Sequence, residues 1–355
     1  MMEKYRITQN KGMEFGIYSL GDHIPNPYTG ERISSKTRIK EIIELAKLAE
    51  QAGIDFFGVG ESHQEYFTTQ AHSVVIAAIA QATKKIKIGS ASTIVSTLDP
   101  VRVFEDFSTI DLISNGRAEI VAGRASRVGL FDLLGYNVRD YEELFEEKFN
   151  LLLEINEKEK INWSGNFREP LRNAVVIPRP AEGKLPIWRA VGGPPASAIR
   201  AGKAGVPMFL ATLGGPVSNF KFSIDAYRQA AEQSGFEASS LPIATAGMFY
   251  VAKTTQEALR EFYPHVNQAT KLINGSGYPK QHFAQATDTR DVMNVGSPQQ
   301  IVEKILYQHE VFGHQRYVAQ LDVGGVPFDK IRKNIELIGT EILPAVKKYT
   351  SIMEG

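Results

Sequence analysis

The fold is decided by residues 85–127, which read KIKIGSASTIVSTLDPVRVFEDFSTIDLISNGRAEIVAGRASR. Residues 85–94 are a short β-branched run that ends in small polar residues, which is typical of a buried strand that meets a ligand at its C-terminal end. Asp99 and Pro100 then predict a helix start, because aspartate caps helices and proline suits the first helical position. An Asn-Gly pair ends this helix, and residues 117–123 form a second strand. The stretch is therefore one strand–helix–strand unit of the length that a parallel crossover needs.

The rest of the chain repeats this alternation of element types without repeating its sequence. Eight strands separated by helices are predicted, at residues 14–20, 56–60, 85–94, 117–123, 186–191, 206–211, 243–252 and 316–322. Eight strands alternating with helices predict an α/β fold, the TIM (β/α)8 barrel. A doubly wound open sheet is the alternative, because the same local pattern serves both folds.

In this interpretation the 355 residues make a single barrel domain, 1–355, with residues 1–12 as an N-terminal extension. Two stretches, 159–185 and 264–295, show no regular pattern. They are predicted to be irregular insertions after strands four and seven, where long loops commonly cover an active site or move.

Composition excludes several classes of protein. Forty basic residues balance 40 acidic ones, so no overall charge draws the chain toward nucleic acid or an anionic membrane. The chain has no cysteine, which rules out disulfides, thiol catalysis and thiolate metal sites. Residues 1–12 are polar, unlike a signal peptide, and the most apolar run is too short to span a bilayer. We therefore expect a cytoplasmic protein.

In a barrel, the active site lies where the strands end. No two histidines among these ends have a metal-ligand spacing, and no lysine ends a strand as a Schiff-base aldolase requires. The predicted ends are small, polar and rich in glycine: Gly21, Glu61-Ser62-His63, residues 90–93, Gly123-Arg124, Gly192-Gly193, Thr212 and residues 322–325.

Two of these ends suggest an anion site. The Gly192-Gly193 turn leads directly into a helix that contains Ser197, and the first N–H groups of a helix bind anions. Arg124, or Arg127 in its place, can add a guanidinium, which binds phosphate well. The alternatives are a tight turn without a ligand and a surface ion pair.

Two further ends suggest a flat ligand and a base. The small residues 90–93 leave room for a planar ring, although they also suit a polar loop. His63 is the only histidine at a strand end, and a lone histidine is more often structural than catalytic. Glu61 is expected to hold a histidine or a backbone N–H group.

Together these segments resemble the bacterial luciferase-like, flavin-dependent monooxygenase family over nearly the whole chain. The resemblance rests on the order and spacing of Gly58-Val-Gly-Glu-Ser-His63, Lys85-Ile-Lys-Ile-Gly89, Asp99-Pro-Val-Arg102, Leu112-Ile-Ser-Asn-Gly-Arg117 with Gly123-Arg124, and Gly296-Ser-Pro298.

The resemblance implies a barrel that binds reduced FMN, or F420 in one branch of the family. By motif, Arg124 and the Gly192-Gly193 turn would hold the phosphate, and Gly123 and Ser197 are further cofactor-binding residues. The segment Ala91-Ser92-Thr93 would border the isoalloxazine ring, where the family often has a cis peptide.

The implied activity is that of an FMN-dependent monooxygenase, which uses reduced flavin and O2 to oxygenate a small organic substrate. A separate NAD(P)H:flavin reductase would reduce the flavin, since the chain lacks a dinucleotide-binding glycine fingerprint. Luciferases proper carry Glu-His-His where this chain has Glu61-Ser62-His63, so Ser62 and His63 are the candidate catalytic residues. An F420-dependent dehydrogenase and a non-catalytic flavin-binding protein are the alternatives.

Two expectations concern assembly and motion. The predicted helix 74–83 is apolar on nearly every side, and the resembling family dimerises through this helix and the next, so a homodimer is expected. Residues 264–295 are expected to form a mobile lid over the flavin.

Overall fold

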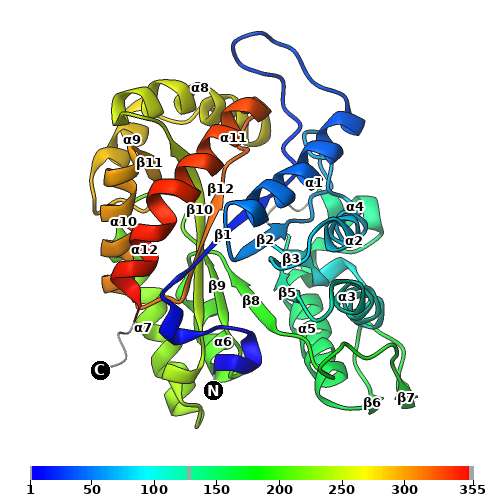
Figure 1. The fold of residues 1–355 in the computed structure, drawn as a ribbon. Coiled ribbons are helices and arrows are strands. Elements are labelled where there is room, and N and C mark those ends of the chain that lie inside the picture. Colours follow the sequence, from blue (N-terminus) through cyan, green and yellow to red (C-terminus); the bar gives the residue numbers. More distant parts are fainter. Residues whose placement is uncertain (1, 126–128, 352–355) are drawn as a thin grey trace.

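Eight parallel strands close into a barrel (Figure 1) in the computed structural model, which describes residues 2–125 and 129–351. β12 pairs with β1 and β9 pairs with β10, so the sheet has no free edge between them. This closure confirms the (β/α)8 prediction over the open sheet. The strands are β1 (Glu14–Ser19), β2 (Phe56–Val59), β3 (Lys87–Ser90), β5 (Ala118–Gly123), β8 (Ile187–Val191), β9 (Met208–Ala211), β10 (Ile243–Val251) and β12 (Arg316–Gln320).

The helices begin where the capping residues predict. Asp99 accepts a hydrogen bond from the N–H of Val101 at 2.8 Å, and Asn115 ends the same helix in the left-handed region at φ 57°. No helix in the described part of the chain is long and apolar enough to cross a membrane. The helices around the barrel are α1 (Ser35–Gln51), α2 (His72–Ala82), α3 (Pro100–Ser114), α5 (Tyr141–Glu157), α6 (Pro195–Lys203), α7 (Val217–Gln233), α10 (Pro298–Phe312) and α11 (Phe328–Leu337).

The sequence predicts a single last helix from 328 to 349, but the structure divides it. A π-helical segment, Ile338–Ile342, separates α11 from α12 (Leu343–Thr350). Gly339 lies in this segment, and a Cβ there would come within 3.0 Å of the Cβ of Ala52, the C-cap residue of α1. The segment therefore packs close to the end of α1.

The first insertion is not irregular. Residues 159–185 contain an antiparallel hairpin of β6 (Lys160–Trp163) and β7 (Leu171–Val175). Figure 1 places this hairpin at the opposite end of the barrel from α8 (Thr255–Asn274), because the chain has already returned along α5. This insertion therefore does not cover the C-terminal ends of the strands.

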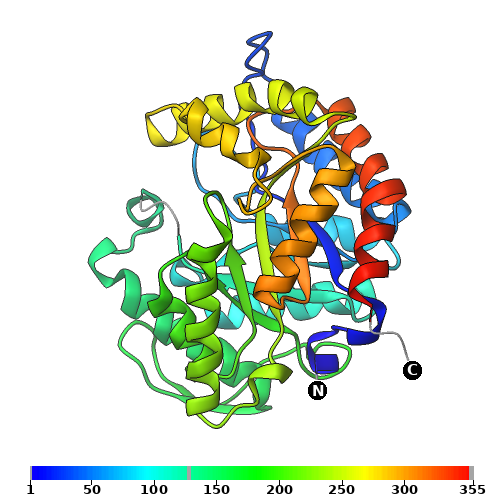
Figure 2. The ribbon, with the colours of Figure 1, turned by 90° about the vertical axis from the view of Figure 1, so that its left-hand side faces the viewer.

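The prediction that 264–295 is irregular is also wrong. Helix α8 continues through Pro264 to Asn274, followed by α9 (Lys280–Ala284) and the short strand β11 (Asn294–Gly296). Pro264 cannot donate to the Arg260 carbonyl, and the hydroxyl of Tyr28 donates to that oxygen instead, at 3.3 Å. Figures 1 and 2 both show α8 crossing one end of the barrel. Whether this roof moves stays a prediction.

The N-terminal extension packs against the barrel. Met2, Tyr5 and Ile7 are buried. Arg6 donates to the carbonyl of Ala118, at the start of β5, and to the carboxylate of Asp111 at 3.1 Å. These contacts attach residues 2–7 to the N-terminal end of β5.

A largely buried ion cluster fills the barrel interior at this end. Arg316 of β12 bonds to Glu119 of β5 at 2.7 Å and to Glu14 of β1 at 2.8 Å. Its guanidinium also lies over the rings of Phe56 and Trp188, 4.5 and 5.0 Å from their centroids. Burial alone would raise the pKa of the Glu119 carboxyl, but the charge of Arg316 outweighs burial and lowers this pKa.

We predict that Glu119→Gln lowers the free energy of unfolding by about 3–5 kcal/mol at pH 7, because it leaves Arg316 with one buried partner fewer. The folded-state pKa of Glu119 lies below its unfolded value of 4.5, so its ionised form stabilises the fold above pH 4.5. That contribution is lost as the pH falls through the folded pKa, and the gap between variant and wild type should narrow there.

Urea unfolding of both proteins from pH 7 to pH 3 measures this gap. Glu232→Gln, at an exposed position of α7, is the matched control and should change the stability little. A Glu119→Gln protein as stable as wild type at pH 7 would contradict the prediction.

Candidate active site

A cavity of about 390 Å³ opens at the C-terminal ends of the strands. Its wall contains Ser62, His63, Ala91, Ser92, Arg124 and Gly192, all predicted from the sequence. Further residues that line the cavity were not predicted as site residues: Tyr18, Leu20, Ile94, Leu130, Tyr141, Val191, Phe209 and Leu213.

Four predicted residues are not among those that line the cavity. Thr93 is fully buried, and its hydroxyl contacts the His72 Nε2 atom at 2.8 Å. Gly123 faces Ser92 so closely that a Cβ would come within 2.2 Å of the Ser92 hydroxyl. Gly193 and Ser197 belong to the turn into α6. Gly123 therefore makes room for the cavity wall.

The Ala91–Ser92 peptide bond is cis, as the family resemblance suggested for this segment. Two glycines at the end of the neighbouring strand β2 leave room for it. A Cβ on Gly60 would come within 2.7 Å of the Ala91 carbonyl oxygen, and one on Gly58 within 2.8 Å of the Ala91 Cβ. The Ser92 carbonyl accepts a hydrogen bond from the N–H of Glu61 at 2.9 Å. These contacts fix the peptide at the cavity wall.

Glu61 holds the candidate base. Its Oε1 atom contacts the His63 Nε2 atom at 2.6 Å, and its Oε2 atom accepts from the N–H of Ile94 at 2.7 Å. The Glu61 side chain is only 1% exposed, while that of His63 is 12% exposed. A second imidazole, His72, lies 3.7 Å from Oε2, and burial lowers its pKa despite the nearby carboxylate. Glu61 thus orients His63, as expected from the sequence.

The turn before α6 has the features of an anion cradle. Gly193 has φ +80°, and a Cβ on Gly192 or Gly193 would meet no atom within 4 Å, so both backbones face open space. The Ser197 hydroxyl in the first turn of α6 is buried and has no hydrogen-bond partner. A buried, unpaired hydroxyl beside free helix N–H groups suits an anionic ligand oxygen.

Arginines and glutamates alternate beside this cradle. Arg124 pairs with Glu142, and Arg200 bonds to Glu142 at 2.7 Å and to Glu146 at 3.0 Å. Arg189 also bonds to Glu146, and although burial opposes ionisation, these arginines lower the pKa of Glu146. Three guanidinium groups and two carboxylates leave one net positive charge. Arg127, the alternative to Arg124, lies outside the described residues.

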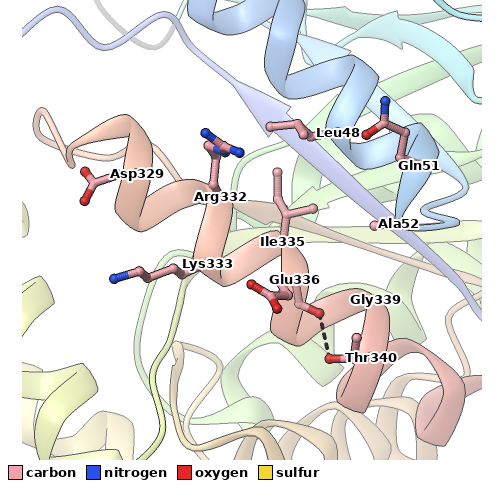
Figure 3. Close-up of a pocket in the computed structure, with 10 residues that line it drawn as sticks. All are labelled: Leu48, Gln51, Ala52, Asp329, Arg332, Lys333, Ile335, Glu336, Gly339 and Thr340. Carbon is pink, nitrogen blue, oxygen red and sulfur yellow. Dashed lines mark hydrogen bonds between the residues drawn. The ribbon is translucent and has the colours of Figure 1, made fainter.

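A larger groove of about 630 Å³ lies on the outside of the barrel, between the end of α1 and α11 with the π-helical segment that follows it (Figure 3). Arg332, Lys333, Glu336 and Asp329 contribute charged side chains to it. Its lining comes from outer helices and from no strand end, so its position does not match a barrel active site.

The sequence missed Tyr18 and Glu142 for different reasons. Tyr18 lies one residue before the end of β1, and its place beside a predicted strand end was the available signal. Glu142 was read only as part of a helix, and its pairing with Arg124 comes from tertiary packing.

Residues 13–315 match the model of the luciferase-like monooxygenase family. An uncharacterised protein of Sinorhizobium fredii, y4vJ, is 24% identical over 95% of this chain and 98% of its own. The alkanal monooxygenase alpha chain of Photorhabdus laumondii is 22% identical over 95% of this chain and 98% of its own.

Solved structures share the fold. Monooxygenase RslO1 from Streptomyces bottropensis superimposes with a TM-score of 0.82 at 23% identity, covering 94% of this chain and 99% of its own. The FMN complex of the oxygenating constituent of 3,6-diketocamphane monooxygenase from Pseudomonas putida gives 0.75 at 19% identity, over 94% and 98%. The F420-dependent tetrahydromethanopterin reductase of Methanopyrus kandleri gives 0.71 at 20% identity, over 94% and 99%. Since the family model spans most of the chain, the protein belongs to the luciferase-like monooxygenase family of enzymes.

Proposed function

We propose that this enzyme is an FMN-dependent monooxygenase, which oxygenates a small organic substrate with reduced FMN and O2. The observation that carries the proposal is the α6 cradle, with its unpaired Ser197 hydroxyl, at one side of a cavity that Ala91, Ser92 and His63 also line. A phosphate in the cradle would place a flat ring against the Ala91–Ser92 segment. These residues fit FMN.

Bound in its reduced form, FMN supplies two electrons, with which one oxygen atom of O2 enters the substrate and the other leaves as water. The protein's part is to hold and orient the reactants. His63 uses Nε2 for Glu61, so its Nδ1 atom is the one that can exchange a proton with a ligand. Ser62 can donate a hydrogen bond but is a poor base at neutral pH.

The electron source is proposed to be a separate NAD(P)H:flavin reductase. The glycines at this site belong to the turn before α6, and they precede a helix in a barrel rather than a dinucleotide-binding βαβ unit. FMN reduced elsewhere would enter through the open mouth of the cavity.

Oxygen-isotope transfer tests the function. The enzyme is mixed anaerobically with photoreduced FMN, then exposed to 18O2 with ketones, aldehydes and alkanes, and the products are analysed by mass spectrometry. We expect one 18O atom in a product and its loss in His63→Ala, with FMN binding retained. FMN binding without incorporation from any of these compounds would favour the non-catalytic alternative. Tighter binding of F420 than of FMN would favour the dehydrogenase.

Replacement of Arg124 tests the phosphate site. We predict that Arg124→Ala weakens FMN binding about tenfold to a hundredfold, the worth of a charge-assisted hydrogen bond, and leaves riboflavin binding nearly unchanged. Glu142→Gln should tighten FMN binding, because Arg124 then loses a competing partner. Titration of both flavins, reduced and oxidised, measures these effects.

Arg102→Ala is the matched control, since the Arg102 side chain is 71% exposed on α3. An equal loss of affinity for both flavins would mean that Arg124 has a structural role and that the phosphate binds elsewhere.

We also propose a homodimer that buries α2 and α3. These helices pack together, and Val74, Leu112 and Ile113 on them are 68%, 44% and 41% exposed. Exposed apolar side chains on packed surface helices are a common mark of interfaces. Val75, Ile76 and Ile79 of α2 are buried against their own chain.

Sedimentation equilibrium checks the dimer. We expect a dimer at micromolar concentration and dissociation in Val74→Glu, which places a charge in the interface. Phe222→Glu, at a 67% exposed position of α7, should remain dimeric. A monomeric wild-type protein would contradict the proposed dimer.

A further inference from the structure

A second cavity of about 590 Å³ adjoins the candidate flavin cavity. The two cavities share Tyr18, Leu20 and Leu213 in their walls. The second cavity extends from there under α8 and α9, away from the anion cradle. We call it the roof chamber. A molecule in it would lie beside a ring held against Ala91 and Ser92.

Most of the roof chamber wall is apolar. Leu213 and Met248 come from the barrel strands and their ends, while Ala269 and Ile273 come from the last turns of α8. Tyr278 closes the side toward α9, and its hydroxyl would touch a Cβ on Gly214 at 2.9 Å. This wall offers a ligand hydrophobic contact over most of its surface.

One end of the roof chamber carries an ordered polar chain. The Tyr18 hydroxyl donates to Gln320 Oε1 at 3.1 Å, and Gln320 Nε2 donates to Asp22 Oδ1 at 3.4 Å. The second Asp22 oxygen accepts from the N–H of Gly324 at 2.9 Å. Burial raises the pKa of Tyr18, so the phenol stays protonated and keeps its hydrogen on Gln320. The second N–H of Gln320 and the phenol oxygen remain to meet a ligand.

The charges of the two cavities differ. The flavin cavity contains Arg124, whereas the described residues that line the roof chamber include no lysine or arginine. The carboxylate in its wall, Asp22, already accepts two hydrogen bonds and is 4% exposed. A carboxylate or phosphate ligand would be repelled by Asp22 and would find no guanidinium or ammonium group among the described lining residues, where the one imidazole is that of His282.

We propose that the roof chamber is the substrate site and takes an uncharged, mainly apolar molecule with one carbonyl or hydroxyl group held by Tyr18 and Gln320. This inference rests on the proposed monooxygenase function. The two residues are then specificity-determining, since a site built to hydrogen-bond a ligand group discriminates against analogues that lack it. The cavity volume lies in the range of small-molecule sites.

Four probes of equal chain length separate the chemical classes: 2-decanone, decane, decanoate and decylamine. Their binding to the enzyme saturated with oxidised FMN is measured by ligand-observed NMR, so no turnover is needed. We expect 2-decanone to bind about tenfold more tightly than decane, the worth of one net hydrogen bond. Decanoate should bind most weakly. A preference for decanoate or decylamine over 2-decanone would overturn the proposal.

Two variants locate the site. Gln320→Leu should remove the preference for 2-decanone over decane without weakening decane binding. Ile273→Trp fills the chamber and should abolish binding of all four probes while FMN binding is unchanged. Ala269→Leu, a smaller addition, should weaken the probes in the same direction if the tryptophan variant does not fold. Phe222→Trp, on the exposed side of α7, is the control for Ile273→Trp.

The outcomes distinguish this inference from the proposed function. If the probes bind and FMN does not, the roof chamber remains the proposed substrate site and the FMN assignment is wrong. If FMN binds and Ile273→Trp leaves probe binding unchanged, the roof chamber is not the substrate site, while the FMN assignment stands. Loss of FMN in Ile273→Trp, with Phe222→Trp unaffected, would mean that the chamber belongs to the flavin site.

Discussion

The barrel depends on one ion cluster that crosses its interior. Arg316 of β12 and Glu119 of β5 lie on opposite sides of the barrel, four strands apart in the sheet order, and both are fully buried. Their contact can form only when the sheet has closed to the correct circumference. Two charges removed from water would otherwise cost several kcal/mol each, so misregistered closures are disfavoured. Arg316 and Glu119 therefore meet only in a barrel with this number of strands.

The same cluster makes the two ends of the barrel interior chemically different. Charged groups and their aromatic neighbours fill the N-terminal end, where Trp188 also donates to Glu119. At the C-terminal end, small residues such as Ala91, Ser92 and Ala246 leave the interior open. One end is therefore packed for stability and the other is free for ligands, with a buried carboxylate, Glu61, organising the side chains around the opening.

The sequence predicted what local chemistry controls. Strand ends, the Asp99 cap and the Asn115 stop follow from residues within one turn of each other, and the structure has them in place. The strand-end rule also brought Ser62, His63, Arg124 and Gly192 to one cavity. It failed where the decisive partner is distant in the chain. Gln320 meets Tyr18 across 302 residues, and neither residue carries a local signal for that contact.

The helix through Pro264 has a mechanical consequence. Its missing hydrogen bond is completed by Tyr28, from the loop between β1 and α1, and the Tyr28 ring also packs edge-on against His265 at 5.8 Å. The loop is thus joined to α8 at the turn where Pro264 leaves the helix without one of its backbone hydrogen bonds. If α8 is lifted from the barrel, the loop between β1 and α1 must follow it or these Tyr28 contacts must break.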